Sequence, residues 1–520
     1  MSAMEKNLFR VLFVGAAFAL CGSGIASAAT SATPIVIAQA SPAPKASPTP
    51  SAFTYGGYVR AYYFTRTNFP QFTKTQNQAS ENQAVSLHAG YDFGGGFSVA
   101  GTYLYANPFN NCEDPVLHIT KTSPCYKSRV FGPTGGTNPD DTLPGYKMST
   151  LYEAYLQYKG PEVFLRLGDQ VVNSPWANAS DSRLKPVAFR GGDFSYKVDK
   201  NWTIEAMYMN RWEDRVASDF TDTTILTQNG VYPDAGGVSN TGIKSGTWIT
   251  NNGFYYGRAG YADGPFTANL HYYGFDQIAN AVWGDAKYAW KAYGKPFIAL
   301  QGGTESNTGT SLAGKINSQV FGVQAGYSPW NNVDLTVGAD FIPVKSDTIT
   351  LPLTASCGSN DEIKGTLMYF LPTGGTPNCK TATPNVPGAA ATVYYGGWAS
   401  PYTDSYATDP LFDTSISQGM VDRRSPGSGV KLAGTFYSDQ KQIRLILSHA
   451  WYVYGNGTVG ISPTQESNVD ATYFFSKVGK GPYHGFSIRH RYADRTQTFT
   501  GPFGGLPEFK YNRTQLEYDF

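Results

Sequence analysis

Several arginines near the C-terminal end of the chain have the residue type and the spacing to bind anionic groups. Arg489 and Arg491 are separated by one residue, so on a β-strand both side chains point to one face, about 7 Å apart. Arg444 and Arg513 lie in neighbouring segments of the same alternating type, and Arg60 lies in the first such segment. Guanidinium groups bind carboxylates through short, often bidentate hydrogen bonds. On adjacent strands the five arginines would form a basic row; the alternative is that each makes an ion pair that only rigidifies the protein.

Signals for catalysis or metal binding are weak in the same sequence. An enzyme that uses covalent catalysis needs a nucleophile with a positioned base. His449 and His490 lie on strand-like segments, but the spacing places no serine opposite them. We therefore expect no catalytic residues, no cofactor and no metal ion. An enzyme embedded in the outer membrane is the alternative from another functional class.

The elements that position the arginines are predicted to be membrane-crossing β-strands. Such a strand needs about ten residues in which apolar and polar side chains alternate with period two. About eighteen segments fit this pattern. The predicted strands are 54–66, 82–92, 97–106, 149–159, 162–170, 189–198, 202–211, 253–262, 266–275, 285–293, 296–304, 318–328, 333–342, 428–437, 441–453, 468–478, 483–492 and 510–520.

The two faces of these segments carry different residues. One face holds nearly all the charges, including the arginines above and the acidic residues Glu153, Asp193 and Asp340. Burying Lys or Arg at the bilayer midplane costs about 2–4 kcal/mol, which explains the segregation. We predict an all-β fold, a transmembrane antiparallel β-barrel with a wet, charged lumen; the alternative is a soluble sheet protein whose apolar face forms a core. The predicted lipid-facing rows include Val85, Leu87, Ala89 and Tyr91, then Tyr152, Ala154, Leu156 and Tyr158, then Phe321, Val323, Ala325 and Tyr327.

The connections between the segments alternate in length, as they do in membrane barrels. Short turns such as 159–162 and 263–265 alternate with long connections such as 107–148, 213–252 and 343–426. We predict that the turns are periplasmic and the long loops extracellular. An even strand number places both ends of the barrel on the short-turn side.

Two of the connections are candidates for narrowing the lumen. The segment 171–188 is polar and too short to form a domain, and the 343–426 loop is rich in Gly, Pro, Thr and Tyr. Whether the 343–426 loop narrows or plugs the lumen stays open at this point. The residues expected at the constriction are Ser174, Trp176, Asp181, Arg183 and Lys185.

Composition and the two ends of the sequence predict a location in the bacterial outer membrane. The formal net charge of +1 gives no electrostatic reason to bind nucleic acid, and the 15% aromatic content suits aromatic girdles. Residues 1–28 read as a cleaved signal peptide ending at Ala26-Ser27-Ala28, with Ala38-Gln39-Ala40 as an alternative site. Residues 29–53 form a Pro/Ala-rich periplasmic linker, and 54–520 the barrel. The final strand ends on Phe520, which resembles the C-terminal signature of outer-membrane proteins, so we expect the barrel-assembly machinery of Gram-negative bacteria to be a partner.

The cysteines of the mature chain predict disulfides in two extracellular loops. Four remain after the signal peptide, two in each of two long connections. An oxidising compartment favours disulfides, and proximity selects one of three connectivities. The predicted pairs are Cys112–Cys125 and Cys357–Cys379.

Four short motifs carry a resemblance to a known family. They are 151–156 (Leu-Tyr-Glu-Ala-Tyr-Leu), 164–170 (Phe-Leu-Arg-Leu-Gly-Asp-Gln), 180–186 (Ser-Asp-Ser-Arg-Leu-Lys-Pro) and 189–192 (Phe-Arg-Gly-Gly). In this order they resemble the OprD-type family of outer-membrane porins. The resemblance implies eighteen strands, a basic ladder opposite an acidic patch, and monomeric or loosely trimeric channels for small carboxylates, basic amino acids or sugars. The Pro-rich linker, the cysteine-bearing loops and the length of 343–426 depart from the family.

These features predict a porin that passes small solutes, carboxylates or amino acids, through a water-filled channel over a basic ladder. The expected partners are outer-membrane lipid and anionic or zwitterionic solutes. The alternatives are a polysaccharide-export barrel and a structural barrel plugged by its loops. The solute, the oligomeric state and the signal cleavage site are not fixed by the sequence.

Overall fold

The computed structural model describes residues 52–71, 74–108, 147–180, 183–227, 248–313, 316–350, 390–403, 408–417, 419–421, 426–454, 463–476, 485–497 and 509–520. The predicted signal peptide, nearly all of the predicted linker and both predicted cysteine pairs lie outside these residues.

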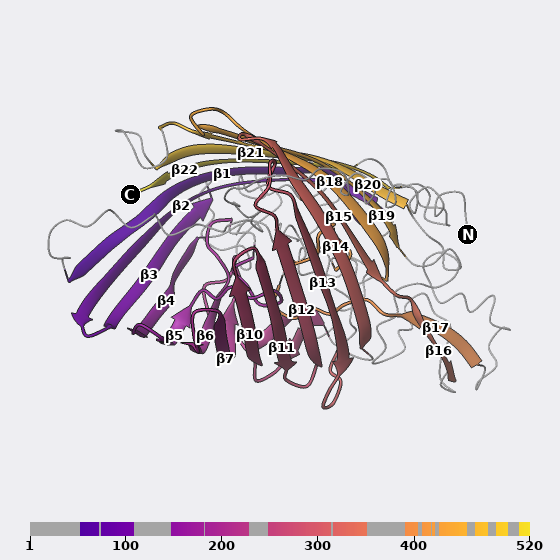
Figure 1. Ribbon diagram of the computed structural model, residues 1–520, viewed down its shortest axis with the longest axis horizontal. Coiled ribbons are helices and arrows are strands. Elements are labelled where there is room, and N and C mark those ends of the chain that lie inside the picture. The colour runs from indigo at the N-terminus through magenta and orange to yellow at the C-terminus, as the bar shows by residue number, and fades with distance from the viewer. Residues whose placement is uncertain are drawn as a thin grey trace, which may run out of the picture.

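Eighteen antiparallel strands form one closed sheet (Figure 1). Each strand pairs with the next barrel strand, and β1 pairs with both β2 and β22, which closes the barrel. The prediction of an antiparallel barrel of about 18 strands is confirmed. The barrel strands are β1 (Phe53–Gln71), β2 (Lys74–Gly94), β3 (Phe97–Pro108), β4 (Met148–Lys159), β5 (Val163–Gln170), β6 (Ala188–Lys197), β7 (Trp202–Glu213), β10 (Phe254–Asp263), β11 (Phe266–Phe275), β12 (Ala279–Ala289), β13 (Phe297–Asn307), β14 (Asn317–Trp330), β15 (Val333–Ile342), β18 (Gly427–Tyr437), β19 (Ile443–Tyr454), β20 (Pro463–Phe474), β21 (Phe486–Gln497) and β22 (Phe509–Asp519).

Two small hairpins lie outside the barrel sheet. β8 (Thr223–Thr227) pairs with β9 (Trp248–Thr250), and β16 (Lys345–Thr350) pairs with β17 (Ala390–Tyr395). Figure 1 shows β16 and β17 projecting beyond the wall. Among the described residues, no helix is long and apolar enough to cross a membrane.

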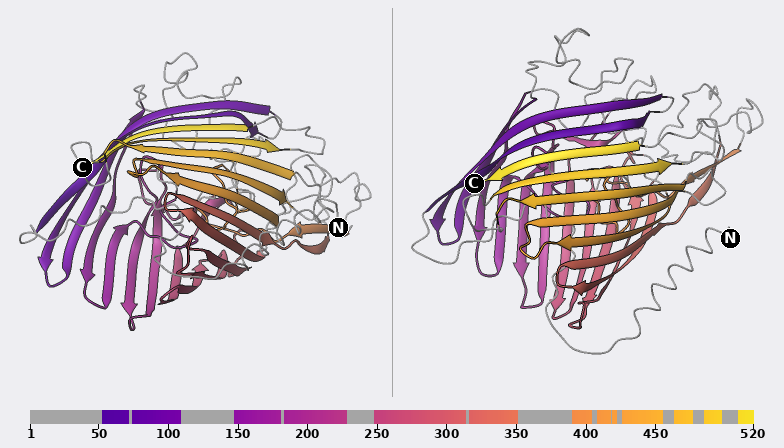
Figure 2. Two further views of the ribbon diagram at one scale, coloured as in Figure 1. Left: turned by 45° about the horizontal axis from the view of Figure 1, so that its top comes forward. Right: turned by 90° about the horizontal axis from the view of Figure 1, so that it is seen from above.

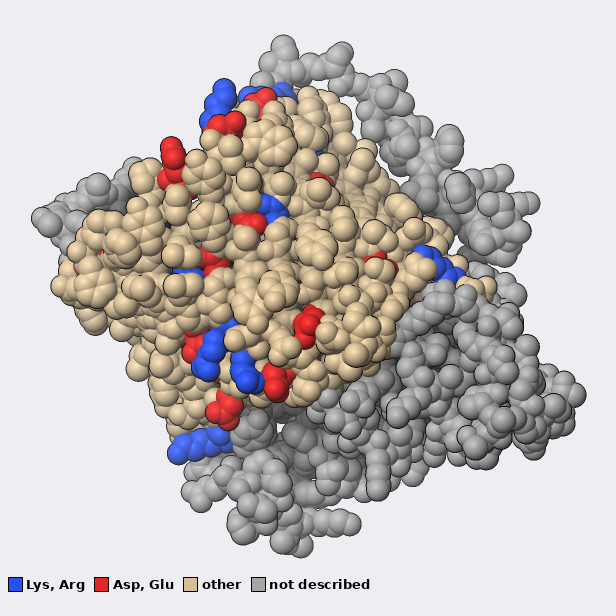
Figure 3. Space-filling model, turned by 90° about the horizontal axis from the view of Figure 1, so that it is seen from below, with Lys and Arg blue, Asp and Glu red and all other residues tan. Residues whose placement is uncertain are grey.

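The outer face of the barrel is apolar. Large hydrophobic side chains on alternate positions, such as Leu87, Leu300 and Phe321, are exposed, while their sequence neighbours face inward. On the side of the molecule drawn in Figure 3, uncharged surface covers most of the area and charged side chains form small scattered groups. Because exposed apolar patches on soluble monomers are much smaller than a whole barrel wall, this face is suited to lipid.

One predicted lipid-facing residue, Tyr152, instead lies on the inner face. Tyr152 is 4% exposed, whereas Leu151 before it is 51% exposed. The register shifts between Thr102 and Tyr103 of β3, which pair with Glu153 and Leu151 and leave Tyr152 without a partner across the ladder. This β-bulge adds one residue to β4, so the alternation changes phase there.

Short turns join the strands at one rim. At the β2–β3 turn, Gly94, Gly95 and Gly96 all have positive φ, a conformation that residues with a Cβ rarely adopt. The two ends of the barrel meet at the same rim, where Gly57 and Phe520 exchange backbone hydrogen bonds of 3.1 and 3.0 Å. The views in Figure 2 show β1 beside the C-terminal strand.

Candidate functional site

The five predicted arginines come together on one part of the inner wall. They lie on β19, β21, β22 and β1, four strands of the contiguous stretch β19–β20–β21–β22–β1. Arg491 is directly opposite Arg513, and Arg60 is directly opposite Glu517. We call Arg60, Arg444, Arg489, Arg491 and Arg513 the basic cluster.

Two carboxylates neutralise part of this cluster. Asp470 accepts hydrogen bonds from both Nε (2.8 Å) and Nη2 of Arg489, and from Nε of Arg491 (3.0 Å). Glu517 pairs with Arg60. Asp470 and Glu517 therefore pair with three of the five guanidinium groups of the basic cluster, those of Arg489, Arg491 and Arg60.

The arginines differ in their access to the lumen. Arg491 and Arg513 are each 1% exposed, so they act on the lumen mainly through their electric field. The side chain of Arg489 is 18% exposed. Arg444 is partly buried, donates from Nη2 to Thr472 Oγ1 at 3.2 Å, and forms no ion pair with any described residue. Arg444 is therefore the member of the cluster that is best placed to bind an anion directly.

Residues 171–180 and 183–187 form a first inward segment that packs against the inner wall. Ser174 donates from its backbone N–H and from Oγ to the Ala177 carbonyl, at 2.9 and 2.8 Å, which makes a tight turn. The turn presents Trp176, whose backbone N–H donates to Tyr273 Oη at 3.2 Å. The Trp176 ring is fully buried against Trp283 of β12. Trp176 thus anchors the segment rather than lining an aperture.

The C-terminal half of this segment is fixed by charge. Lys185 forms a buried ion pair of 2.9 Å with Glu213, and Thr150 donates to the same carboxylate at 2.8 Å. Burial lowers the pKa of Lys185, and Glu213 opposes that shift. Arg183 is also buried, Arg60 donates to its carbonyl, and its Nε and Nη1 have no hydrogen-bond partner among the described residues. Asp181 lies outside the described residues.

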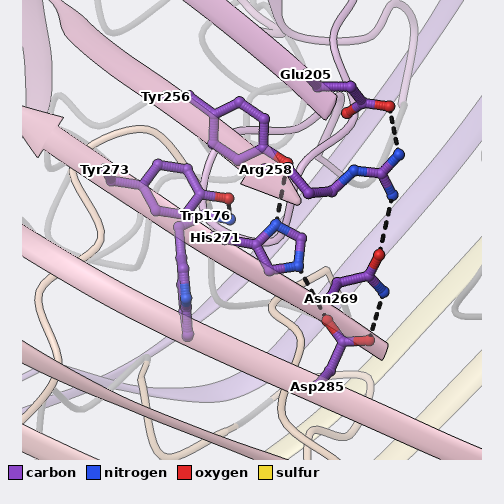
Figure 4. Close-up of polar contacts among 8 residues, drawn as sticks. All are labelled: Trp176, Glu205, Tyr256, Arg258, Asn269, His271, Tyr273 and Asp285. Atoms are coloured by element: carbon purple, nitrogen blue, oxygen red, sulfur yellow. Dashed lines mark hydrogen bonds and ion pairs between the residues drawn. The ribbon is translucent and has the colours of Figure 1, made fainter. Parts of the chain in front are cut away.

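A second polar network covers another part of the wall, from β7 to β12 (Figure 4). His271 lies between Tyr256 Oη at 3.0 Å and Asp285 Oδ2 at 2.9 Å. Asn269 connects Asp285 to Arg258, with distances of 2.8 and 3.2 Å, and Arg258 pairs with Glu205. His271 was not among the residues predicted from the sequence; the signal that could have found it is its polar side chain on the alternating segment 266–275, which forms β11.

The three predicted lumen acids have different environments. Asp193 is partly buried on β6, directly opposite Arg166 of β5. Glu153 accepts a hydrogen bond of 2.6 Å from Thr102. Asp340 is buried beneath a loop, so it is not part of the open lumen surface.

That loop is a second inward segment, formed by residues 396–403, 408–417 and 419–421. Its Trp398 stacks on Trp176 with ring centroids 4.9 Å apart and also contacts Trp283. Asn178 of the first segment donates to the Thr408 carbonyl at 3.0 Å. Within 343–426, residues 396–403, 408–417 and 419–421 therefore enter the lumen and meet the first inward segment there, whereas β16 and β17 project beyond the wall (Figure 1). Both candidates for narrowing the lumen pack inside the barrel.

The fold and the site define a class of protein. A closed barrel with an apolar outer face, a charged inner wall and two inward segments has the architecture of a transmembrane porin.

Comparisons with known proteins agree with this class. No family model and no curated protein matches the sequence. Among solved structures, a BenF-like porin from Pseudomonas fluorescens Pf-5 has a TM-score of 0.61 at 14% identity. OccAB4 of Acinetobacter baumannii and OccK8 (OprE) of Pseudomonas aeruginosa each have a TM-score of 0.60 at 12% identity. All three alignments cover 90% of this chain and 98% of the other. The predicted resemblance to OprD-type porins is thus confirmed in the fold.

Proposed function

We propose that the protein is an outer-membrane porin through which small anionic solutes, carboxylates above all, diffuse passively. The basic cluster carries this proposal, because it places five guanidinium groups on neighbouring strands of a barrel whose outer face suits lipid. A confined row of cations concentrates anions and offers successive weak binding sites, which is the condition for selective conduction. No catalytic residue, cofactor or metal ion has a part in this function.

The known structures support the solute class by analogy. One structure of Pseudomonas aeruginosa OpdK contains vanillate, which is a carboxylate. In this chain, Arg444 has spare donor capacity and Arg183 has buried donors without partners among the described residues. The Glu205–Asp285 network on another part of the wall would suit the ammonium group of a zwitterion, so amino acids are included in the proposed class.

A charge-removing variant tests the proposal at the most available arginine. Arg444→Gln should lower the rate at which a small carboxylate enters liposomes by about tenfold or more, because one charge-assisted hydrogen bond contributes about 1.5–3 kcal/mol and about 1.4 kcal/mol is a factor of ten. A neutral sugar of similar size should enter at an unchanged rate. The matched control is Lys287→Gln, which removes a positive charge from β12, outside the basic cluster. Equal losses for both solutes would indicate a collapsed lumen, and no loss for either would leave the cluster a purely structural role.

The second inward segment favours one alternative, a barrel that its own loop plugs. Wild-type protein distinguishes the two: liposomes that contain a plugged barrel should not swell in either solute. A polysaccharide exporter has less support, because the inner wall carries both signs of charge.

The cellular setting belongs to the same proposal. We infer a signal-dependent route to the outer membrane of a Gram-negative bacterium, with assembly directed by β22 and Phe520. The native mass of the detergent-solubilised protein would decide between a monomer and a homotrimer.

A further inference from the structure

The wall binds the second inward segment largely through the segment's main chain. Three inward carboxylates each accept a backbone N–H from it: Ala399 to Glu305 Oε2 at 2.7 Å, Asp413 to Asp340 Oδ2 at 2.7 Å, and Ser417 to Glu466 Oε1 at 2.9 Å. These carboxylates come from β13, β15 and β20, so the segment is bound at well-separated places on the wall.

Donors on the wall bind the carbonyls of the same segment. Tyr452 of β19 donates to the Asp413 carbonyl at 2.6 Å, and Arg495 of β21 donates to the Ser417 carbonyl at 3.3 Å. Lys431 of β18 donates to the Thr414 carbonyl. Small residues on the wall make room for this contact: a Cβ at Gly429 would collide with the Asp413 carboxylate, and one at Gly338 with Phe412.

Among the described residues, the charges buried at this contact do not balance. Asp340, Asp409 and Asp413 are all buried there, and Lys431 is the cation beside them. Asp413 is 0% exposed, and neither of its carboxylate oxygens has a hydrogen-bond partner among the described residues. An ionised carboxylate in such a site is strongly disfavoured, and it takes up a proton instead.

We propose that residues 408–417 form a proton-linked gate, which docks on the wall when the buried aspartates take up protons and is released when they ionise. The proposal rests on the proposed channel function and adds regulation to it: acid favours the docked, narrower lumen, and higher pH favours a wider one. The gate lies within the second inward segment, and its docking requires no bound ligand.

The direction of the pH effect follows from the aspartates of the segment itself. Burial raises the pKa of Asp409 to about 7, and burial followed by repulsion from Asp340 and Asp409 raises the pKa of Asp413 well above its usual range. A free aspartate has a pKa of about 4, so the docked segment binds more protons than the released one. Docking is therefore strongest below about pH 4 and weakens as the pH rises through about 7, by up to about tenfold per pH unit for each proton taken up.

The charged and titratable groups that face Asp409 and Asp413 come from each neighbouring strand. They are Asp340 of β15, Lys431 of β18, Tyr452 of β19, Glu466 of β20 and Arg495 of β21. Lys431 offsets one negative charge, and the Glu466–Arg495 pair lies at Ser417, at the end of the segment.

Amide hydrogen exchange of the folded, full-length protein measures the docking of residues 408–417 independently of whether the channel conducts. For peptides that cover 408–417, protection corrected for the intrinsic pH dependence should fall as the pH rises from about 5 to about 8. Asp413→Asn mimics the protonated side chain and should raise the protection and weaken its pH dependence, leaving only the part that Asp409 contributes; Asp409→Asn should weaken the dependence by removing the Asp409 part. Asp439→Asn, in an exposed turn, is the matched control and should behave as wild type. If Asp413→Asn does not assemble, Asp409→Asn carries the test.

Conductance tests the consequence for the lumen. Wild-type conductance should increase over the same pH range, and the increase should be smaller in Asp413→Asn. Protection that stays constant or rises with pH in the wild type, or a wild-type pH dependence in both asparagine variants, would overturn the gate. Absence of any current, with the exchange pattern as predicted, would refute the channel function and leave the proton-linked docking intact.

Discussion

Arginines in the lumen differ in how much of their charge reaches a solute. Asp470 binds Arg489 and Arg491 together, so a solute that approaches this pair meets a partly neutralised group. Arg444 has no such partner among the described residues. The spacing of Arg489 and Arg491 correctly predicted a shared face, but it did not reveal the carboxylate between them, because Asp470 is on another strand.

The buried ion pair between Lys185 and Glu213 holds the first inward segment in place, and this role can be tested. Lys185→Met should release the first inward segment, because it leaves the Glu213 carboxylate buried without a cation, which costs about 3–5 kcal/mol. Peptides that cover 183–187 should then exchange their amide hydrogens faster, including the Val187 N–H that donates to the Ala179 carbonyl at 2.9 Å.

Two further variants control this prediction. Lys159→Met, at the exposed C-terminal end of β4, should leave the exchange unchanged. The double variant Lys185→Met/Glu213→Gln should recover part of the protection, since the unpaired charge is gone. Unchanged exchange in the single variant would show that the pair does not hold the segment.

Period-two alternation in the sequence located every strand of the barrel, but it did not give the correct first and last residues of all of them. The predicted segment 285–293 corresponds to β12 (Ala279–Ala289), which begins earlier because 279–284 continue the ladder to β11 and β13. Alternation also cannot reveal a β-bulge, because one extra residue reverses which positions of the strand face inward. For this reason the assignment of Tyr152 to the lipid face was wrong. Inward segments are harder still, because their contacts join residues far apart in the chain.

Three tryptophans join the two inward segments to β12, and their contact can be tested. Trp398→Ala should detach the second segment from Trp176 and Trp283, because removal of a buried aromatic ring costs about 3–5 kcal/mol. We expect larger and noisier single-channel currents than in wild type. Trp290→Ala, which removes an exposed ring on the outer face of the barrel, should leave the currents unchanged. Quiet wild-type currents in Trp398→Ala would mean that the main-chain contacts alone hold the segment.

For the whole molecule, the sequence predicted the closed wall and its two faces because both follow from a local rule. An even number of alternating segments joined by short turns closes into a barrel without a free edge. The free cross-section of the lumen does not follow from that rule. It depends on how the two inward segments pack inside, and those contacts are made with side chains on strands that lie far apart in the sequence, such as β13 and β20.

The measurement that tests the central claim most directly is the reversal potential of the wild-type protein in a planar bilayer under a salt gradient. The account predicts an open, water-filled conductance that favours anions, with a preference that weakens as salt rises because the screening length shortens from about 10 Å at 0.1 M to about 3 Å at 1 M. A preference for cations, or no conductance at any pH, would contradict the assignment of the basic cluster as the path of anionic solutes.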